Sequence, residues 1–216
     1  MEYKFNTCIE SLKILILPYS RLSNHFVGKG MVDIKPHNRT DNNKNFNRMI
    51  LKKIEEALNQ QINAELWSAY LYLSMSLHFE HEGRKGFANW FRIQFQEEQA
   101  HALALMDFLN ARDGRVVLKP IAEVPNTWDS PLAAFQATLE HEKNVTAMIN
   151  NLYAMAEQEK DFATRQKLNT FVAEQVEEED NVRQIIDDLT LVGNDGTGLY
   201  QIDAQLATRT FVAPQL

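Results

Sequence analysis

Cysteine, proline and glycine are scarce in this sequence, and each scarcity excludes a class of structure or site. Among 216 residues the single cysteine, Cys8, allows neither an intramolecular disulfide nor a metal site built from thiolates alone. No apolar run approaches the roughly 20 residues that a membrane-spanning helix needs, so we expect no membrane partner. With only six prolines and eight glycines, long stretches contain no helix breaker, which permits long helices.

Basic residues are also scarce, but unevenly so. The net charge is −7, with 14 basic and 25 acidic residues from position 49 onward, whereas residues 1–48 hold eight basic and four acidic residues. Such an acidic chain is unsuited to wholesale binding of nucleic acid, and we expect no nucleic-acid partner. Length and charge together predict one domain at 49–216, preceded by a separate segment.

The segment 1–48 has no helical periodicity, and asparagine is frequent between positions 37 and 47. This composition predicts a disordered extension. Its apolar run at 14–17 is too short for the core of a secretion signal, and we expect a cytoplasmic protein.

Four long segments of the remainder carry apolar residues at helical spacing, and glycines or prolines separate most of them. They cover 51–77, 87–109, 132–156 and 168–189, and a shorter segment follows Gly198. No glycine or proline occurs from 132 to 192, so we place a turn in the polar stretch at 157–161. The first apolar run comprises Leu51, Ile54, Leu58, Ile62, Leu66, Ala69, Leu73 and Leu77.

The connection between the second and third segments is long and contains Pro120, Pro125 and Pro131. Its roughly 17 residues can run the length of a helical bundle, whereas short connections favour antiparallel neighbours. We therefore predict an all-α fold: a ferritin-like four-helix bundle with a long crossover between helices 2 and 3 and a short fifth C-terminal helix. The expected order is up–down, crossover, up–down.

Polar residues interrupt the apolar stripe near the middle of every long segment. They are Glu65, Glu98, Glu142 and Glu178, with His101 and Gln175 beside them. Mid-helix positions of a bundle meet in one layer, where four buried carboxylates repel unless protons or cations neutralise them. No lysine or arginine lies on these stripes at that level. Two divalent ions would balance the charge, and oxygen ligands with one imidazole favour iron or manganese.

Each of these residues alone has a plainer interpretation. A single inward glutamate commonly lies at the edge of its stripe with its carboxylate in water. A single histidine such as His101 is commonly a core residue with its hydrogen bonds satisfied. The coincidence of four interrupted stripes favours a buried metal centre.

Several stretches of the chain resemble bacterial non-haem ferritin. They are residues 63–66 with Tyr72, 96–101, 142–146, 173–179 and 198–203, which match in residue type, spacing and order. The resemblance extends from Met49, where family members begin, to the C-terminus. It suggests that residues 1–48 precede the natural start of translation, and a genuine targeting or nucleic-acid-binding tail is the alternative.

The resemblance implies a ferroxidase centre in each subunit, at which O₂ or H₂O₂ oxidises Fe(II). The first iron would be held by Glu65, Glu98 and His101, with Glu98 bridging, and the second by Glu142 and Glu178, with Gln175 nearby. A third iron position would be formed by Glu97, Glu174 and Glu177, although a solvated acidic face explains these three equally well.

Two further features bear on this centre. Tyr72 lies two turns from Glu65 on the same face, either as a hydrogen-bonding or electron-donating residue or as a core aromatic. Bacterioferritin and many di-iron oxidases repeat Glu-x-x-His in the fourth helix, whereas this chain has Gln175-x-x-Glu178. The second iron would therefore lack an imidazole and bind more weakly. No haem is expected, because helical methionines are usually core residues.

The implied function is iron storage, with ferric oxo-hydroxide deposited inside a hollow homo-oligomer of about 24 subunits. The alternatives are a di-iron oxidase or peroxidase without storage, a DNA-protecting mini-ferritin with a basic tail, and a metal-free bundle. A single cysteine disfavours a rubrerythrin-like oxidase, and the short fifth segment disfavours a mini-ferritin. His78 and His81 could bind a surface metal or complement a helix end, and His141 is unassigned.

Overall fold

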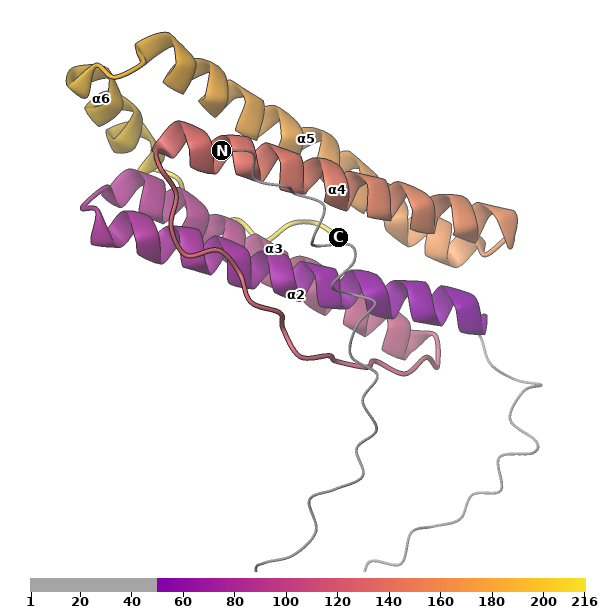
Figure 1. Ribbon diagram of the computed structural model, residues 1–216. Helices are drawn as coiled ribbons and strands as arrows, with labels where there is room; N and C mark the ends of the chain where they lie inside the picture. The colour runs from indigo at the N-terminus through magenta and orange to yellow at the C-terminus, as the bar shows by residue number, and fades with distance from the viewer. Residues whose placement is uncertain (1–49) are drawn as a thin grey trace, which may run out of the picture. The chain divides into compact units, whose positions relative to one another are not determined.

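The computed structural model describes residues 50–216, so the extension predicted at 1–48 lies outside the described residues. The regular elements of the described part are all helices, as expected from the periodicity (Figure 1). Its elements are α2 (Lys52–His81), α3 (Lys85–Ala111), α4 (Pro131–Gln158), α5 (Phe162–Val192) and α6 (Gly196–Leu206). The turn between α4 and α5 falls where the sequence predicts it, and α6 begins two residues before Gly198. None of these helices combines the length and apolar composition needed to cross a bilayer.

Local capping explains where three of the helices begin. The Ser130 hydroxyl accepts a hydrogen bond from the backbone N–H of Ala133 at the start of α4, where a proline occupies the first turn. Asp161 accepts from Thr164 at the start of α5, and Asp195 accepts from Gly198 at the start of α6. These side chains satisfy donors that a helix leaves unpaired at its first turn.

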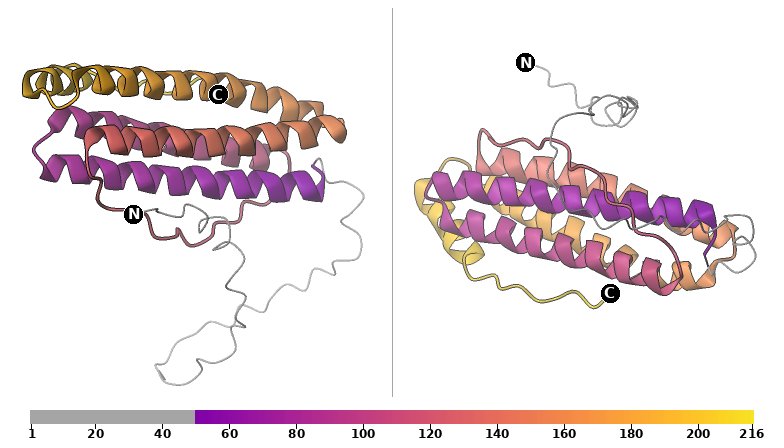
Figure 2. Two further views of the ribbon diagram at one scale, coloured as in Figure 1. Left: turned by 45° about the horizontal axis from the view of Figure 1, so that its top comes forward. Right: turned by 90° about the horizontal axis from the view of Figure 1, so that it is seen from below.

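The long connection follows α2 from one end to the other. Near the start of α2, the backbone N–H groups of Arg115 and Val117 donate to Glu55 and Asn59, at 3.0 and 2.6 Å. Near its end, the ring of Trp128 lies 5.3 Å from that of His78. Figures 1 and 2 show the connection running along the outside of the bundle between these points.

This path corrects the expected direction of the second hairpin. The connection leaves α3 beside the first turn of α2 and reaches α4 beside its last turn, so α4 runs parallel to α3 and antiparallel to α2 (Figure 1). The order is up–down–down–up, and the expected up–down, crossover, up–down order is wrong. A connection that spans the bundle returns the chain to the end where the preceding helix began.

Two apolar clusters fill the bundle, one on each side of its middle. The cluster towards α6 includes Tyr72, Phe79, Phe91 and Phe135. The other cluster includes Ile54, Leu58, Ile62, Leu105 and Phe171. The mid-helix polar residues occupy the layer between the two clusters, which is where the site lies.

The first apolar run was predicted correctly only in part. Ile54, Leu58, Ile62 and Ala69 are buried, but Leu51 is 48% exposed and Leu77 is 54% exposed, and the buried stripe continues instead through Met75 and Phe79. Repeated steps of four residues rotate a run by about 40° each around the helix, because the helical period is 3.6 residues. The run therefore leaves the core face towards the end of α2.

Helix α6 is held against the beginning of α3. One carboxylate oxygen of Asp203 accepts hydrogen bonds from the backbone N–H groups of Gly86 and Phe87, both at 2.9 Å. It thereby caps α3, whose own N-cap residue provides no side-chain bond. A Cβ at Gly86 would lie 1.6 Å from the Asp203 carbonyl oxygen. The chain then turns back along α3, where the Asn89 amide donates to the Arg209 carbonyl oxygen at 2.9 Å (Figure 2).

Gly86→Ala is expected to loosen α6 from α3. Alanine normally stabilises a helix interior relative to glycine by about 0.5–1 kcal/mol, but the clash with the Asp203 backbone costs about 1–3 kcal/mol or more. The expected result is a lower thermal unfolding midpoint. Gly196→Ala is the matched control, because a Cβ there meets no atom within 4 Å. Equal midpoints for both variants would contradict this account of the α3–α6 contact.

Candidate metal centre

Four helices bring buried carboxylates into the layer between the two apolar clusters. The buried residues of this layer include Glu65 on α2, Glu98 and His101 on α3, Glu142 on α4, and Gln175 and Glu178 on α5. Each is at most 6% exposed. The structure therefore places all six of the mid-helix residues in the interior, where carboxylates require partners or protons.

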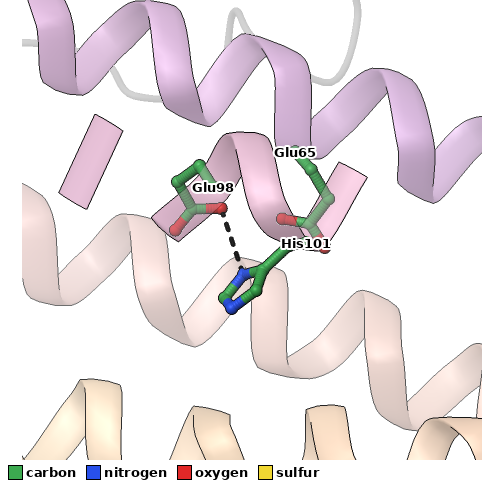
Figure 3. Close-up of side chains that lie close together, drawn as sticks. All are labelled: Glu65, Glu98 and His101. Atoms are coloured by element: carbon green, nitrogen blue, oxygen red, sulfur yellow. Dashed lines mark ion pairs between the residues drawn. The ribbon is translucent and has the colours of Figure 1, made fainter. Parts of the chain in front are cut away.

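Glu65, Glu98 and His101 form the tightest group. One ligand atom from each lies within 4.8 Å of the other two, and His101 Nδ1 is 3.6 Å from Glu98 Oε2. Figure 3 shows the Glu65 side chain extending from the neighbouring helix towards the other two. Oxygen Oε2 of each glutamate and Nε2 of the histidine are buried without a hydrogen-bond partner. Such unpaired buried atoms are rare and costly, and each of the three residues carries one.

Burial sets the protonation of these carboxylates. It raises the pKa of Glu65 well above its usual value, and the nearby Glu98 charge raises it further. Burial likewise raises the pKa of Glu98, with the Glu142 charge as the next contribution. A divalent cation would replace the protons that neutralise this group in the metal-free protein.

Glu142 is held on both of its oxygens. The Tyr72 hydroxyl donates to Oε1, and the Gln175 amide nitrogen donates to Oε2 at 3.1 Å. Burial and the Glu142 charge raise the pKa of Tyr72 well above its usual value, so this side chain remains a phenol. Gln175 was predicted as a residue near the second iron, and in the structure its amide nitrogen orients Glu142 and also reaches Thr146 at 3.2 Å.

Two glutamines that the sequence analysis missed each hold one carboxylate oxygen. Gln61 donates to Glu65 Oε1, and Gln94 donates to Glu178 Oε2, both at 2.8 Å. Gln61 and Gln94 lie four residues before Glu65 and Glu98, on the same inward faces. For Gln61 that spacing was a usable signal, because a polar residue one turn from a buried carboxylate is well placed to orient it. For Gln94 the spacing points to Glu98, whereas its partner in the structure is Glu178 on α5.

An arginine from outside the four helices reaches the edge of this layer. Arg209, in the segment after α6, donates to Glu97 Oε2 at 2.8 Å and to Gln94 Oε1 at 2.6 Å. Burial raises the pKa of Glu97 to about 7, although the Arg209 charge opposes this shift. The stripes themselves carry no cation, and no local pattern links Arg209 to a residue 112 positions earlier.

The three residues assigned to a third iron position are not gathered in this structure. Glu97 faces Arg209, Glu174 is half-buried, and Glu177 is exposed. Within residues 50–216, no other trio of acidic, histidine or cysteine side chains meets the closeness of Glu65, Glu98 and His101.

The remaining histidines have other surroundings. His141 Nε2 lies 2.8 Å from the Ser68 hydroxyl, and its ring lies between Trp67 and Tyr72, with centroids 5.3 and 5.9 Å away. Burial lowers the pKa of His141 to about 4, so the ring is neutral. His78 packs against Trp128 beneath the long connection, whereas His81 is exposed.

Comparison with known proteins identifies close relatives. Residues 55–192 match the family model of the ferritin-like domain. The chain is 44% identical over 161 residues to the bacterial non-heme ferritin of Bacteroides fragilis (strain 638R), which covers 74% of this chain and 100% of that protein. The corresponding protein of Staphylococcus aureus (strain MRSA252) is 37% identical over 163 residues, or 76% and 98% of the two chains. A solved open-pore ferritin from the archaeon Archaeoglobus fulgidus superposes on this chain with a TM-score of 0.74 at 53% identity. The match covers 74% of this chain and 99% of that ferritin.

Glu178→Gln is expected to stabilise the metal-free protein in a pH-dependent way. Burial raises the pKa of Glu178 from 4.5 to about 7, so the wild-type protein loses stability as the pH rises through that window. The uncharged glutamine avoids this loss, and the gain at pH 8 reaches up to roughly 3 kcal/mol, shrinking towards zero near pH 4.5.

Denaturant unfolding of both proteins at pH 5 and pH 8, after removal of metal, measures this difference. Glu140→Gln on the exposed side of α4 is the control and should change stability little at either pH. A gain for Glu178→Gln that is the same at both pH values would contradict the raised pKa.

Proposed function

Because the chain belongs to the ferritin family, we propose that it stores iron and that its buried carboxylate layer is a ferroxidase centre, which oxidises Fe(II) before storage. The observation that carries the proposal is the convergence of Glu65, Glu98 and His101, which are buried and each offer a ligand atom within 4.8 Å of the other two. Oxygen atoms with one imidazole suit iron.

The layer offers ligands for two ferrous ions as substrates. The first ion binds Glu65, Glu98 and His101, where one oxygen of Glu65 is already oriented by Gln61. The second ion binds between Glu98, Glu142 and Glu178, with Glu98 as the bridge. Binding requires the carboxyl groups to lose protons, whereas Glu142 can keep its hydrogen bonds from Tyr72 and Gln175, because each carboxylate oxygen has a second lone pair for the metal.

The electrons of the oxidation step balance when the two ferrous ions react together. Two Fe(II) ions supply two electrons, and O₂ with two protons then yields H₂O₂, whereas H₂O₂ with two protons yields two waters. The carboxylates favour the product because their negative charge stabilises Fe(III) more than Fe(II). Tyr72 stands beside Glu142 and can hold that ligand in place or supply a further electron.

Storage follows from assembly of the domain at 49–216. We propose that about 24 copies of the chain form a hollow shell in the cytoplasm, and that ferric oxo-hydroxide leaves the centre for its interior. Residues 1–48 have no part in this proposal.

Glu98→Gln is expected to abolish the fast phase of iron oxidation. The variant loses the bridging carboxylate but keeps the size of the side chain, so the rate should fall at least about 100-fold, as for other essential ligands. The measurement is an aerobic Fe(II) titration of the purified protein followed by ferric absorbance. Glu140→Gln, on the exposed side of α4, should behave like the wild type. A fast phase of normal amplitude in Glu98→Gln would refute the assignment.

The two irons are expected to bind with unequal affinity. The first position includes the imidazole of His101, whereas the second has Gln175 and Glu178 in place of a Glu-x-x-His pair. Brief treatment with a chelator should therefore remove about half of the bound iron much faster than the rest. Iron lost in a single uniform phase would contradict the expected difference between the two positions.

A further inference from the structure

Arg209 is a preorganised cation at the rim of the carboxylate layer. One guanidinium nitrogen donates to Gln94 Oε1 at 2.6 Å, and the other donates to Glu97 Oε2 at 2.8 Å. The guanidinium also lies over the ring of Trp90, 4.9 Å from its centroid. The backbone of the same residue is fixed by the Asn89 amide, so both the main chain and the side chain are anchored to α3.

The carboxylate that Arg209 occupies belongs to the acidic rim of the centre. Glu97 precedes Glu98 in the chain and is partly buried, with 15% of its side chain exposed. The Glu178 charge acts on Glu97, and Gln94 links Arg209 to Glu178 by hydrogen bonds on both ends of its amide. A further metal ion arriving beside Glu97 would therefore meet the oxygen that Arg209 already holds.

We propose that Arg209 competes with metal for Glu97, so that the centre binds two ions and admits a third only when Arg209 leaves that carboxylate. This inference rests on the proposed ferroxidase centre and concerns how many ions it holds. The guanidinium is permanently charged, and a divalent cation beside it would be repelled. Metal can still displace Arg209 from Glu97, because 23% of the Arg209 side chain is exposed and the segment that carries it lies outside the helices.

The contact between Arg209 and Glu97 therefore limits the number of metal ions that the centre binds. In the wild type, Glu97 is neutralised by the chain itself, and an ion at this position must first break the contact with Arg209. Removing the positive charge leaves Glu97 and Glu178 with no cation at the rim, which raises their combined attraction for metal. Arg209 thus competes with metal for Glu97 and does not itself touch the two ions of the centre.

The test is the number of Zn(II) ions that bind per chain to the metal-free, assembled protein, measured by calorimetry. Zn(II) is a redox-inert probe, so the result does not depend on oxidation. The wild type should bind about two ions per chain and Arg209→Gln about three. Arg165→Gln is the matched control, because Arg165 also contacts a carboxylate, Glu157, and lies over an aromatic ring, Phe162, away from the centre. It should bind about two.

Arg209→Lys separates charge from shape. Lysine keeps a cation near Glu97, so this variant should stay near two ions per chain, and a count of three for lysine would overturn the competition account. A count of two for Arg209→Gln would also overturn it. If the wild type itself fails to bind two ions, the proposed ferroxidase centre fails instead, and the two failures are distinguishable.

Wild-type crystals provide a measurement that needs no variant to fold. After soaking with Zn(II) to about two ions per chain, anomalous scattering should show no peak at Glu97, and Arg209 should keep its contact there. With excess Zn(II), a peak beside Glu97 should be accompanied by movement of Arg209. A peak at Glu97 with the Arg209 contact intact would contradict the proposal.

Discussion

Burial of four carboxylates between two apolar clusters is the constraint on which the rest of this structure depends. Aliphatic and aromatic side chains above and below the layer exclude water, and burial raises the pKa values of Glu65, Glu98 and Glu142. The carboxyl groups of the metal-free layer must therefore carry protons. Bound cations would neutralise these carboxyl groups in place of the protons. The apolar clusters stabilise the fold and also create the affinity for metal.

Polar neighbours keep this layer ordered without neutralising it. Gln61, Gln94, Gln175 and Tyr72 each donate a hydrogen bond to one carboxylate oxygen of the layer. Such partners fix the direction of a ligand and leave its charge for the metal. The segment after α6 brings a cation, Arg209, to the rim of this layer. Packing of Gly86 against Asp203, at the far end of the bundle, therefore also determines where Arg209 lies.

The sequence predicts those features that depend on local periodicity. Helix extents, the turn near residue 160 and the burial of Glu65, Glu98, Glu142 and Glu178 all follow from spacing along single helices. The predicted direction of α4 was wrong, because the direction of this helix depends on the path of the whole connection between α3 and α4. The contact between Gln61 and Glu65 was identifiable from its four-residue spacing. The contacts of Gln94 with Glu178 and of Arg209 with Glu97 join distant segments and leave no local pattern.

The most direct test of this account is to locate ferrous ions in the protein. Metal-free crystals soaked with Fe(II) without oxygen should show two anomalous peaks in each subunit. One should lie among Glu65, Glu98 and His101, where one ligand atom from each lies within 4.8 Å of the other two, and the other between Glu98, Glu142 and Glu178. An empty carboxylate layer, with iron bound only at surface residues, would contradict the claim that these buried carboxylates exist to bind metal.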